Sequence, residues 1–262
     1  MRVFSFRNFR VVALLILLGA VALYVKDQRL VTQGWYRTLE IVVYPINVDD
    51  SPHVEKYLDS LSSKHFADID KFIKRESEKY DVIASTPTTT RLGQRIDNPP
   101  PAPPPPGSSA LNNIVWSLKL RWWIWRQAPD EANDKYLIRM FVHYHDPKKF
   151  SQLMHSVGLQ KGLVGIVNAF GVHSQKRQNN MIITHEFLHT VGATDKYNAA
   201  GLPLAPDGLG NPDQSPLYPQ KKAEIMAGRR AISADHAEMP NSFRSVVVGK
   251  KTAKEIGWLG DV

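Results

Sequence analysis

Two histidines and a glutamate in the second half of the chain have the spacing of a metal site with a general base. His185 and His189 are four residues apart, so on a helix they lie on one face and can both bind one zinc ion through an imidazole nitrogen. Glu186 follows His185 directly and can take a proton from a water on the metal without being a ligand itself. This spacing predicts a helix that carries two zinc ligands and a catalytic base.

A third ligand is expected nearby, because a catalytic zinc ion usually has three protein ligands and one open position. Gly192 follows the last apolar turn and can adopt the left-handed conformation that ends a helix. Asp195, three residues later, could then reach the metal and complete a His-His-Asp site. Two alternatives stay open: Glu224 replaces Asp195 as third ligand, or Glu224 or His236 adds a fourth ligand and makes the site structural.

The pattern formed by these positions resembles the HExxHxxGxxD motif of the metzincin metallopeptidases, in the branch that includes the snapalysin-like enzymes. The resemblance implies an α/β (α+β) zincin domain, with a twisted mixed sheet and an antiparallel edge strand over the zinc-motif helix. It also implies a C-terminal subdomain with a Met-turn and a closing helix. The expected activity is that of a zinc-dependent endopeptidase with one catalytic Zn²⁺ and a peptide or protein substrate. The matching residues are His185, Glu186, His189, Gly192 and Asp195.

Metzincins also place a methionine in a tight turn beneath the metal, and Met226 is the candidate here. Some of them have a tyrosine two residues after that methionine, where this chain has Gly228. Tyr197 is therefore the phenol that could stabilise an oxyanion. Residues 228–240 would form the wall of the pocket for the residue after the scissile bond.

Residues 162–170 predict a short strand ahead of the zinc helix. In metzincins the corresponding edge strand pairs with an extended substrate, and glycines let another backbone approach closely. Substrate would then lie antiparallel along residues 163–169, which include Gly165, Val167 and Asn168. Asn179 and Asn180 predict the N-cap of the zinc helix.

The composition limits the other classes of function. The chain has 262 residues, of which 43% are hydrophobic, enough for one substantial core. It has no cysteine, which excludes disulfides and thiolate metal ligands. The net charge is +8, but residues 1–30 hold five basic residues against one acidic residue, so no nucleic-acid partner is expected. The alternative to an enzyme is a non-catalytic envelope binding protein with a structural metal site.

The N-terminal region is expected to contact a membrane. Residues 11–25 are a continuous apolar run preceded by three arginines, typical of a signal-anchor or a signal peptide. Fifteen residues form a helix of roughly 22 Å, and Arg10 and Lys26 could extend it across the bilayer by snorkelling. We favour a single-pass inner-membrane anchor with the domain on the periplasmic side; cleavage after Ala22 would instead release it. Residues 1–30 are thus the anchor and juxtamembrane segment, and residues 31–262 the metallopeptidase domain.

Three further segments of regular structure are predicted on either side of the middle of the chain. Residues 39–46 predict a first strand, and residues 51–80 predict one or two helices. Residues 136–145 alternate as an inner strand does. His143 and His145 share one face of that strand, and we interpret them as sheet-face histidines rather than a second metal pair, because no third ligand is apparent.

Two other segments have unusual compositions. Residues 85–110 include seven prolines between residues 98 and 107 and predict an exposed loop without helix or inner strand. Residues 112–127 contain four tryptophans among basic residues. They predict an amphipathic helix or strand packed on the core, or alternatively a surface that touches the membrane interface. Near the C-terminus, residues 252–255 resemble a capping box for a closing helix.

Overall fold

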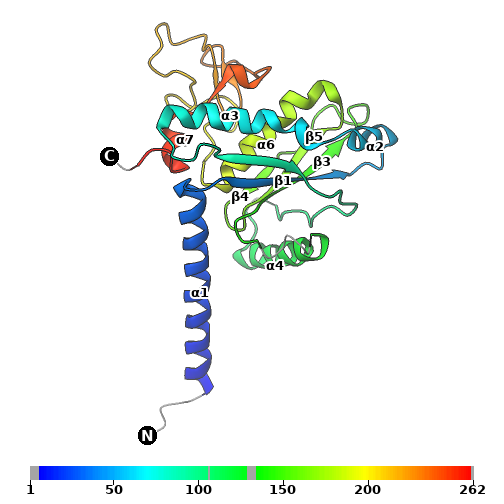
Figure 1. The fold of residues 1–262 in the computed structure, drawn as a ribbon, viewed down its shortest axis with the longest axis vertical. Helices are drawn as coiled ribbons and strands as arrows, with labels where there is room; N and C mark the ends of the chain where they lie inside the picture. The colour runs from blue at the N-terminus through cyan, green and yellow to red at the C-terminus, as the bar shows by residue number, and fades with distance from the viewer. Residues whose placement is uncertain (1–5, 106, 129–133, 261–262) are drawn as a thin grey trace.

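A five-stranded mixed sheet forms the centre of the domain (Figure 1). The computed structural model describes residues 6–105, 107–128 and 134–260. The strand order is β2-β1-β3-β5-β4; the first four are parallel, and β4 pairs antiparallel with β5 at the edge. The predicted α/β class and mixed sheet are thus confirmed, whereas the antiparallel edge strand is β4 and not the predicted segment 162–170. The strands of this sheet are β1 (Leu39–Asn47), β2 (Thr88–Leu92), β3 (Ile138–His145), β4 (Val157–Leu159) and β5 (Val164–Phe170).

Helices cover both faces of the sheet, with α3 and α6 on one face and α4 on the other (Figure 1). The α-helices are α1 (Phe6–Gly34), α2 (Pro52–Asp59), α3 (Ala67–Ser77), α4 (Ala110–Gln127), α6 (Lys176–Thr190) and α7 (Lys250–Glu255). The short 3₁₀ helices are Ser63–His65, Glu78–Tyr80, His173–Gln175 and Phe243–Ser245. Two small two-stranded sheets lie in the C-terminal part: β6 (Ala223–Glu224) with β9 (Val246–Val247), and β7 (Arg230–Ala231) with β8 (Ala237–Glu238).

The central strands are apolar because both of their faces are buried. Along β1, Ile41 and Val43 belong to the core under α3 and α6, while Val42 and Tyr44 belong to the core under α4. This alternation follows from the two-residue period of a strand. The predictions of β1, β3 and the helices between residues 51 and 80 are therefore confirmed.

The predicted loop over residues 85–110 needs a correction at its start. Thr88–Leu92 forms β2, which pairs in parallel with β1 at the sheet edge. The hydroxyls of Thr88 and Thr90 donate to the Asp70 carboxylate of α3 at 2.8 and 2.7 Å, and these bonds satisfy polar groups that burial would otherwise leave unpaired. The part of the proline run that the structure describes, residues 99–105, forms neither helix nor strand.

Two predicted helix starts are wrong. The helix α6 begins at Lys176, so Asn179 and Asn180 lie within it and are buried. Their amides donate to the carbonyls of Phe170 and His65 at 2.9 and 2.8 Å. Similarly, α7 begins at Lys250, so Thr252, which was predicted to cap it, lies inside the helix and is buried. Hydrogen bonds to distant segments determine where these polar residues lie, and a capping rule based on neighbouring residues does not include such bonds.

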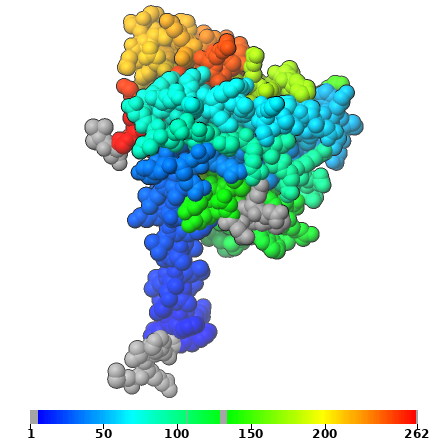
Figure 2. All heavy atoms as spheres, in the orientation of Figure 1, coloured from blue at the N-terminus to red at the C-terminus, as the bar shows by residue number. Residues whose placement is uncertain are grey.

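The N-terminal helix α1 projects from the domain as a single column (Figures 1 and 2). It is long and apolar enough to cross a membrane, as an anchor or a signal sequence would be. Its last turns pack on the domain: Gln33 donates to the carbonyls of Val191 and Glu255, both at 2.9 Å. Just beyond it, the Trp35 indole donates to the Ile256 carbonyl at 2.7 Å. The end of α1 is therefore part of the domain core.

Trp35 should contribute strongly to stability. Its side chain is 1% exposed and meets Phe187 and Trp258 edge-on. Trp35→Ala should lower the free energy of unfolding by about 3–5 kcal/mol, because the vacated volume cannot be refilled. The neighbouring Tyr36 is 77% exposed, so Tyr36→Ala should change it by less than about 0.5 kcal/mol. Urea denaturation of the full-length chain in detergent, followed by circular dichroism, measures both; equal losses would contradict this packing.

Candidate metal centre

The three predicted metal ligands meet at one point. His185 and His189 lie on successive turns of α6, with their Nε2 atoms 3.1 Å apart. Oδ1 of Asp195 lies 3.1 Å from each of these nitrogens. Within the described ranges, this is the one group of at least three histidine and carboxylate side chains that could hold a metal ion, with its ligand atoms within 4.8 Å of one another.

Backbone carbonyls set the orientation and tautomer of both imidazoles. Nδ1 of His185 lies 2.9 Å from the Ile225 oxygen, and Nδ1 of His189 lies 2.8 Å from the Ala193 oxygen. A carbonyl oxygen can only accept, so each Nδ1 donates and each neutral ring has its lone pair on Nε2. Two such lone pairs and a carboxylate oxygen repel one another at these distances unless a cation or a proton lies among them. The donor set therefore fits a metal ion.

Gly192 turns the chain after α6, as predicted. Its φ of +114° lies in the region that favours glycine. A Cβ atom at this position would also collide with the side-chain Nε2 of Gln33 and lie 3.0 Å from the side-chain Nε2 of Gln160. The turn that leads to the third ligand is thus packed directly against the end of α1.

Asp195 is positioned through its two neighbours. Thr194 donates to the Glu255 carboxylate of α7 through its amide and its hydroxyl, both at 2.9 Å. The buried Lys196 forms an ion pair with the same carboxylate at 2.7 Å. Glu255 thereby fixes the backbone on both sides of the ligand. The sequence offered no signal for this role.

The turn beneath the cluster is organised by Glu224. Met226 is fully buried, and its amide donates to Glu224 Oε2 at 2.6 Å, while Thr252 donates to Oε1 at 2.7 Å. The amides of Ala227 and Gly249 add two further bonds, of 3.0 and 3.2 Å. Both oxygens of Glu224 are therefore engaged within the protein, and Glu224 does not join the cluster.

His236 does not join the cluster either. It lies at the surface, 3.7 Å from the Glu238 carboxylate. Glu224 and His236 were the alternatives for a third or fourth ligand, and neither joins the two imidazoles. The cluster therefore consists of His185, His189 and Asp195.

Glu186 lies beside the cluster in a buried position. Burial raises the pKa of its carboxyl, while the nearby charges of His185 and His189 act in the opposite direction. Its Oε2 is buried and accepts no hydrogen bond from any residue that the structure describes. This oxygen could therefore accept a proton.

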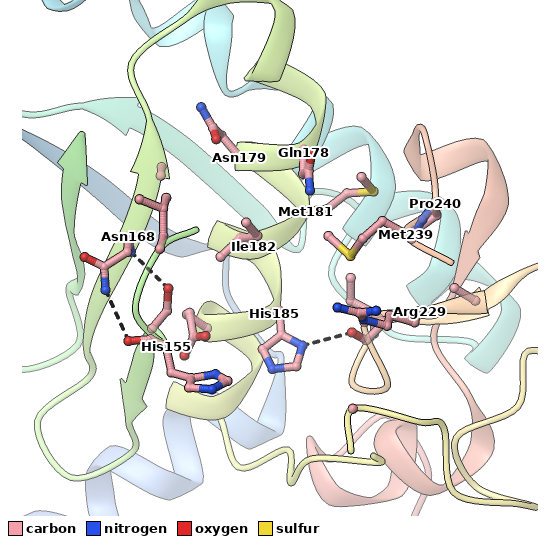
Figure 3. A pocket seen from close by; sticks show the side chains of 18 of the residues that line it. His155, Asn168, Gln178, Asn179, Met181, Ile182, His185, Arg229, Met239 and Pro240 are labelled. Carbon is pink, nitrogen blue, oxygen red and sulfur yellow. Dashed lines mark hydrogen bonds between the residues drawn. The ribbon is translucent and has the colours of Figure 1, made fainter. Parts of the chain in front are cut away.

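A cavity of about 610 Å³ borders His185 and Glu186 (Figure 3). One wall comes from His155 and Asn168, and the opposite wall from Arg229, Met239 and Pro240, as the figure shows. The wall predicted from residues 228–240 thus lies beside the site. His155 was not predicted, because it lies outside every motif.

The strand predicted to bind substrate is not at the sheet edge. Gly165, Val167 and Asn168 belong to β5, which pairs with β3 on one side and β4 on the other. Asn168 also bonds the segment before β4, through His155 O at 3.1 Å and Ser156 Oγ at 2.9 Å. The free edge nearest the cluster therefore belongs to β4, whose short length gave no detectable sequence pattern.

Gly158 lets β4 lie directly on α6. A Cβ atom at this position would overlap the Glu186 carbonyl oxygen and lie 2.5 Å from Cβ of His189. Only a residue without a side chain permits this approach. The β4 edge and the cluster are thus immediate neighbours.

Tyr197 stacks near His185, with ring centroids 6.3 Å apart, and lines the cavity. Burial and the adjacent Asp195 carboxylate raise the pKa of Tyr197 to about 12. Its hydroxyl therefore keeps its proton at neutral pH and can donate a hydrogen bond into the cavity region.

His143 and His145 behave as sheet-face histidines. Burial lowers the pKa of His143 to about 4, and the charge of the neighbouring His145 acts in the same direction. His145 lies 3.1 Å from Asn168 Oδ1 and 3.3 Å from the Asp49 carboxylate. Neither histidine belongs to a possible three-ligand group in the part of the chain that the structure describes.

No model of a known protein family matches the chain, and no curated protein sequence matches it either.

Asp195→Ala should lower the zinc affinity of the protein by more than about 100-fold, because loss of an outer-shell partner alone costs 10–100-fold. Asp213→Ala, in the exposed loop that follows, should leave the affinity unchanged. Competition with a chromogenic chelator measures both. Equal affinities in the two variants would show that Asp195 is not a ligand.

Zinc binding should weaken on acidification from a pH above 6.5. Burial alone would lower the pKa of His185, but the hydrogen bond to Asp195 and the charge of Glu186 together raise it above the ordinary 6.5. Zinc binds the deprotonated ring, so its affinity is full above this raised pKa and falls as the pH drops through it. Chelator competition at a series of pH values measures the onset. An affinity that stays constant to well below pH 6.5 would contradict the expected onset.

Proposed function

We propose that this chain is a membrane-anchored zinc endopeptidase. The proposal rests on one observation: three ligand atoms converge beside a buried glutamate that has an unused oxygen, at the border of a cavity. His185, His189 and Asp195 would hold the metal. The resemblance of their spacing to the metzincin motif supports the same assignment.

The residues around the metal have distinct roles in the proposed hydrolysis. Zinc held by His185, His189 and Asp195 would supply Lewis acidity, which polarises the scissile carbonyl and lowers the pKa of a water. Glu186 takes the proton of the attacking water and passes it to the leaving amine. The carbonyls of Ile225 and Ala193 keep both imidazoles in the binding tautomer. Tyr197 is the candidate donor to the oxyanion, because its protonated phenol lines the cavity beside His185.

Substrate is expected along the free edge of β4. An extended peptide can add to a sheet edge through main-chain hydrogen bonds, and β4 (Val157–Leu159) provides that edge beside Glu186. The residue after the scissile bond would enter the cavity next to His185. Arg229 in the opposite wall favours an acidic side chain there.

The membrane topology follows from the charges that flank α1. Arg7 and Arg10 precede its apolar part, and the positive-inside rule leaves this end in the cytoplasm. The domain would then lie across the membrane, in the periplasm of a bacterial cell.

Glu186→Gln should reduce turnover by about 10²–10⁴-fold with zinc content unchanged, because the amide cannot accept the proton. The control is Glu78→Gln, at an exposed position, which should keep full activity. Cleavage of a quenched fluorescent peptide library by the zinc-loaded protein, together with metal analysis, tests both. Unchanged turnover in Glu186→Gln would refute the mechanism, and an inactive zinc-loaded wild-type protein would refute the endopeptidase assignment.

A further inference from the structure

The helix α4 is apolar on two opposite faces. Its inner face packs on the sheet through Leu120, Trp123 and Ile124, with Trp123 meeting Phe141 edge-on at 4.8 Å. Its outer face carries six large apolar side chains that are each 42–68% exposed: Leu111, Ile114, Val115, Leu118, Trp122 and Trp125. At 3.6 residues per turn they fall within an arc of about 100°, opposite the buried face.

Basic residues border this outer stripe on both sides. The helical positions place Lys119 and Arg126 along one border and Arg121 along the other. The Arg126 guanidinium lies over the Trp122 ring, 5.6 Å from its centroid. An apolar stripe with tryptophans and flanking cations has the chemistry of a helix that lies in the interface of an anionic bilayer.

The position of α4 relative to α1 fits the depth of that interface. Arg121 and Trp125 of α4 and Tyr24 and Gln28 of α1 line one groove of about 470 Å³. The apolar part of α1 ends at Val25, so α4 meets α1 where a membrane span would meet water. Figure 1 shows α4 lying across the direction of α1, on the side of the domain from which α1 projects.

Polar contacts hold α1 and the domain in this relation. The Asp27 carboxylate accepts from Lys135 at 2.7 Å and from Tyr136 at 2.8 Å. Gln28 donates to the Lys135 carbonyl at 2.5 Å. These contacts lie just before β3, next to the groove that α4 borders, so insertion of α1 brings α4 to the membrane surface.

We propose that the outer face of α4 lies in the headgroup region of the bilayer that α1 spans, in contact with anionic phospholipid. This inference rests on the assignment of α1 as a membrane anchor. The sheet then separates the bilayer from α6 and from the cluster of His185, His189 and Asp195. Substrate therefore reaches the site from the aqueous side.

Site-directed spin labelling of the full-length chain tests the proposal, since the described residues contain no cysteine that would compete for the label. Three exposed positions are labelled singly: Leu118→Cys on α4, Leu17→Cys on α1 and Lys71→Cys on α3, across the sheet from α4. The protein is placed in nanodiscs of phosphatidylcholine and phosphatidylglycerol. Collision with oxygen, which dissolves in lipid, is compared with collision with a water-soluble nickel chelate.

The label at 17 is expected to show high oxygen and low nickel accessibility, and the label at 71 to show the reverse. The label at 118, at headgroup depth, is expected to lie between them, with more oxygen and less nickel accessibility than the label at 71. Adding Trp122→Glu and Trp125→Glu should shift the label at 118 to the pattern of 71 while the label at 17 is unchanged. A label at 118 with the same accessibilities as the label at 71, beside a lipid-accessible label at 17, overturns the α4 proposal and leaves the anchor intact. A label at 118 inaccessible to both reagents indicates a protein partner or a second copy and also overturns it. A water-accessible label at 17 refutes the anchor and this inference together.

Discussion

Three electron-pair donors, from two imidazoles and one carboxylate, meet at one point, and the surrounding segments are arranged to hold them there. Atoms of this kind do not gather at about 3 Å on their own account, because their lone pairs repel. The fold overcomes the repulsion by fixing each donor from behind with backbone carbonyls and with the bonds around Glu255. A cation among the donors would turn this unfavourable arrangement into a favourable one, beside the buried carboxylate of Glu186.

The small helix α7 connects the parts that position these donors. Thr252 on α7 donates to Glu224, which holds the turn at Met226. Glu255 on α7 bonds Thr194 and Lys196, the two neighbours of Asp195. Carbonyls at its C-terminal end accept from Gln33 and Trp35, at the end of α1. A helix of six residues thus connects the turn at Met226, the loop that carries Asp195 and the end of α1. Disturbance of any of the three is expected to reach the others.

The sheet divides the molecule into two sides with different surroundings. The core under α3 and α6 supports the cluster, and the core under α4 supports a helix whose outer face is apolar and bordered by basic residues. The end of α1 packs on the domain, so α1 projects from the same side of the molecule as α4. A proteolytic site on the far side of the sheet would act on extended chains that pass along the β4 edge in water.

The features that depend on local spacing could be predicted from the amino-acid sequence alone. Two histidines at positions i and i+4 lie on one helical face, a glycine ends that helix, and the alternating run of residues 136–145 forms an inner strand. Each of these features is specified within about ten consecutive residues. Tertiary structure decided the edge strand, which is β4 rather than Gly165, Val167 and Asn168, and the roles of Glu224 and Glu255 as positioning carboxylates. It also decided the real starts of α6 and α7. These features depend on which distant segments pair or donate to one another, and no short-range period or motif records such partners.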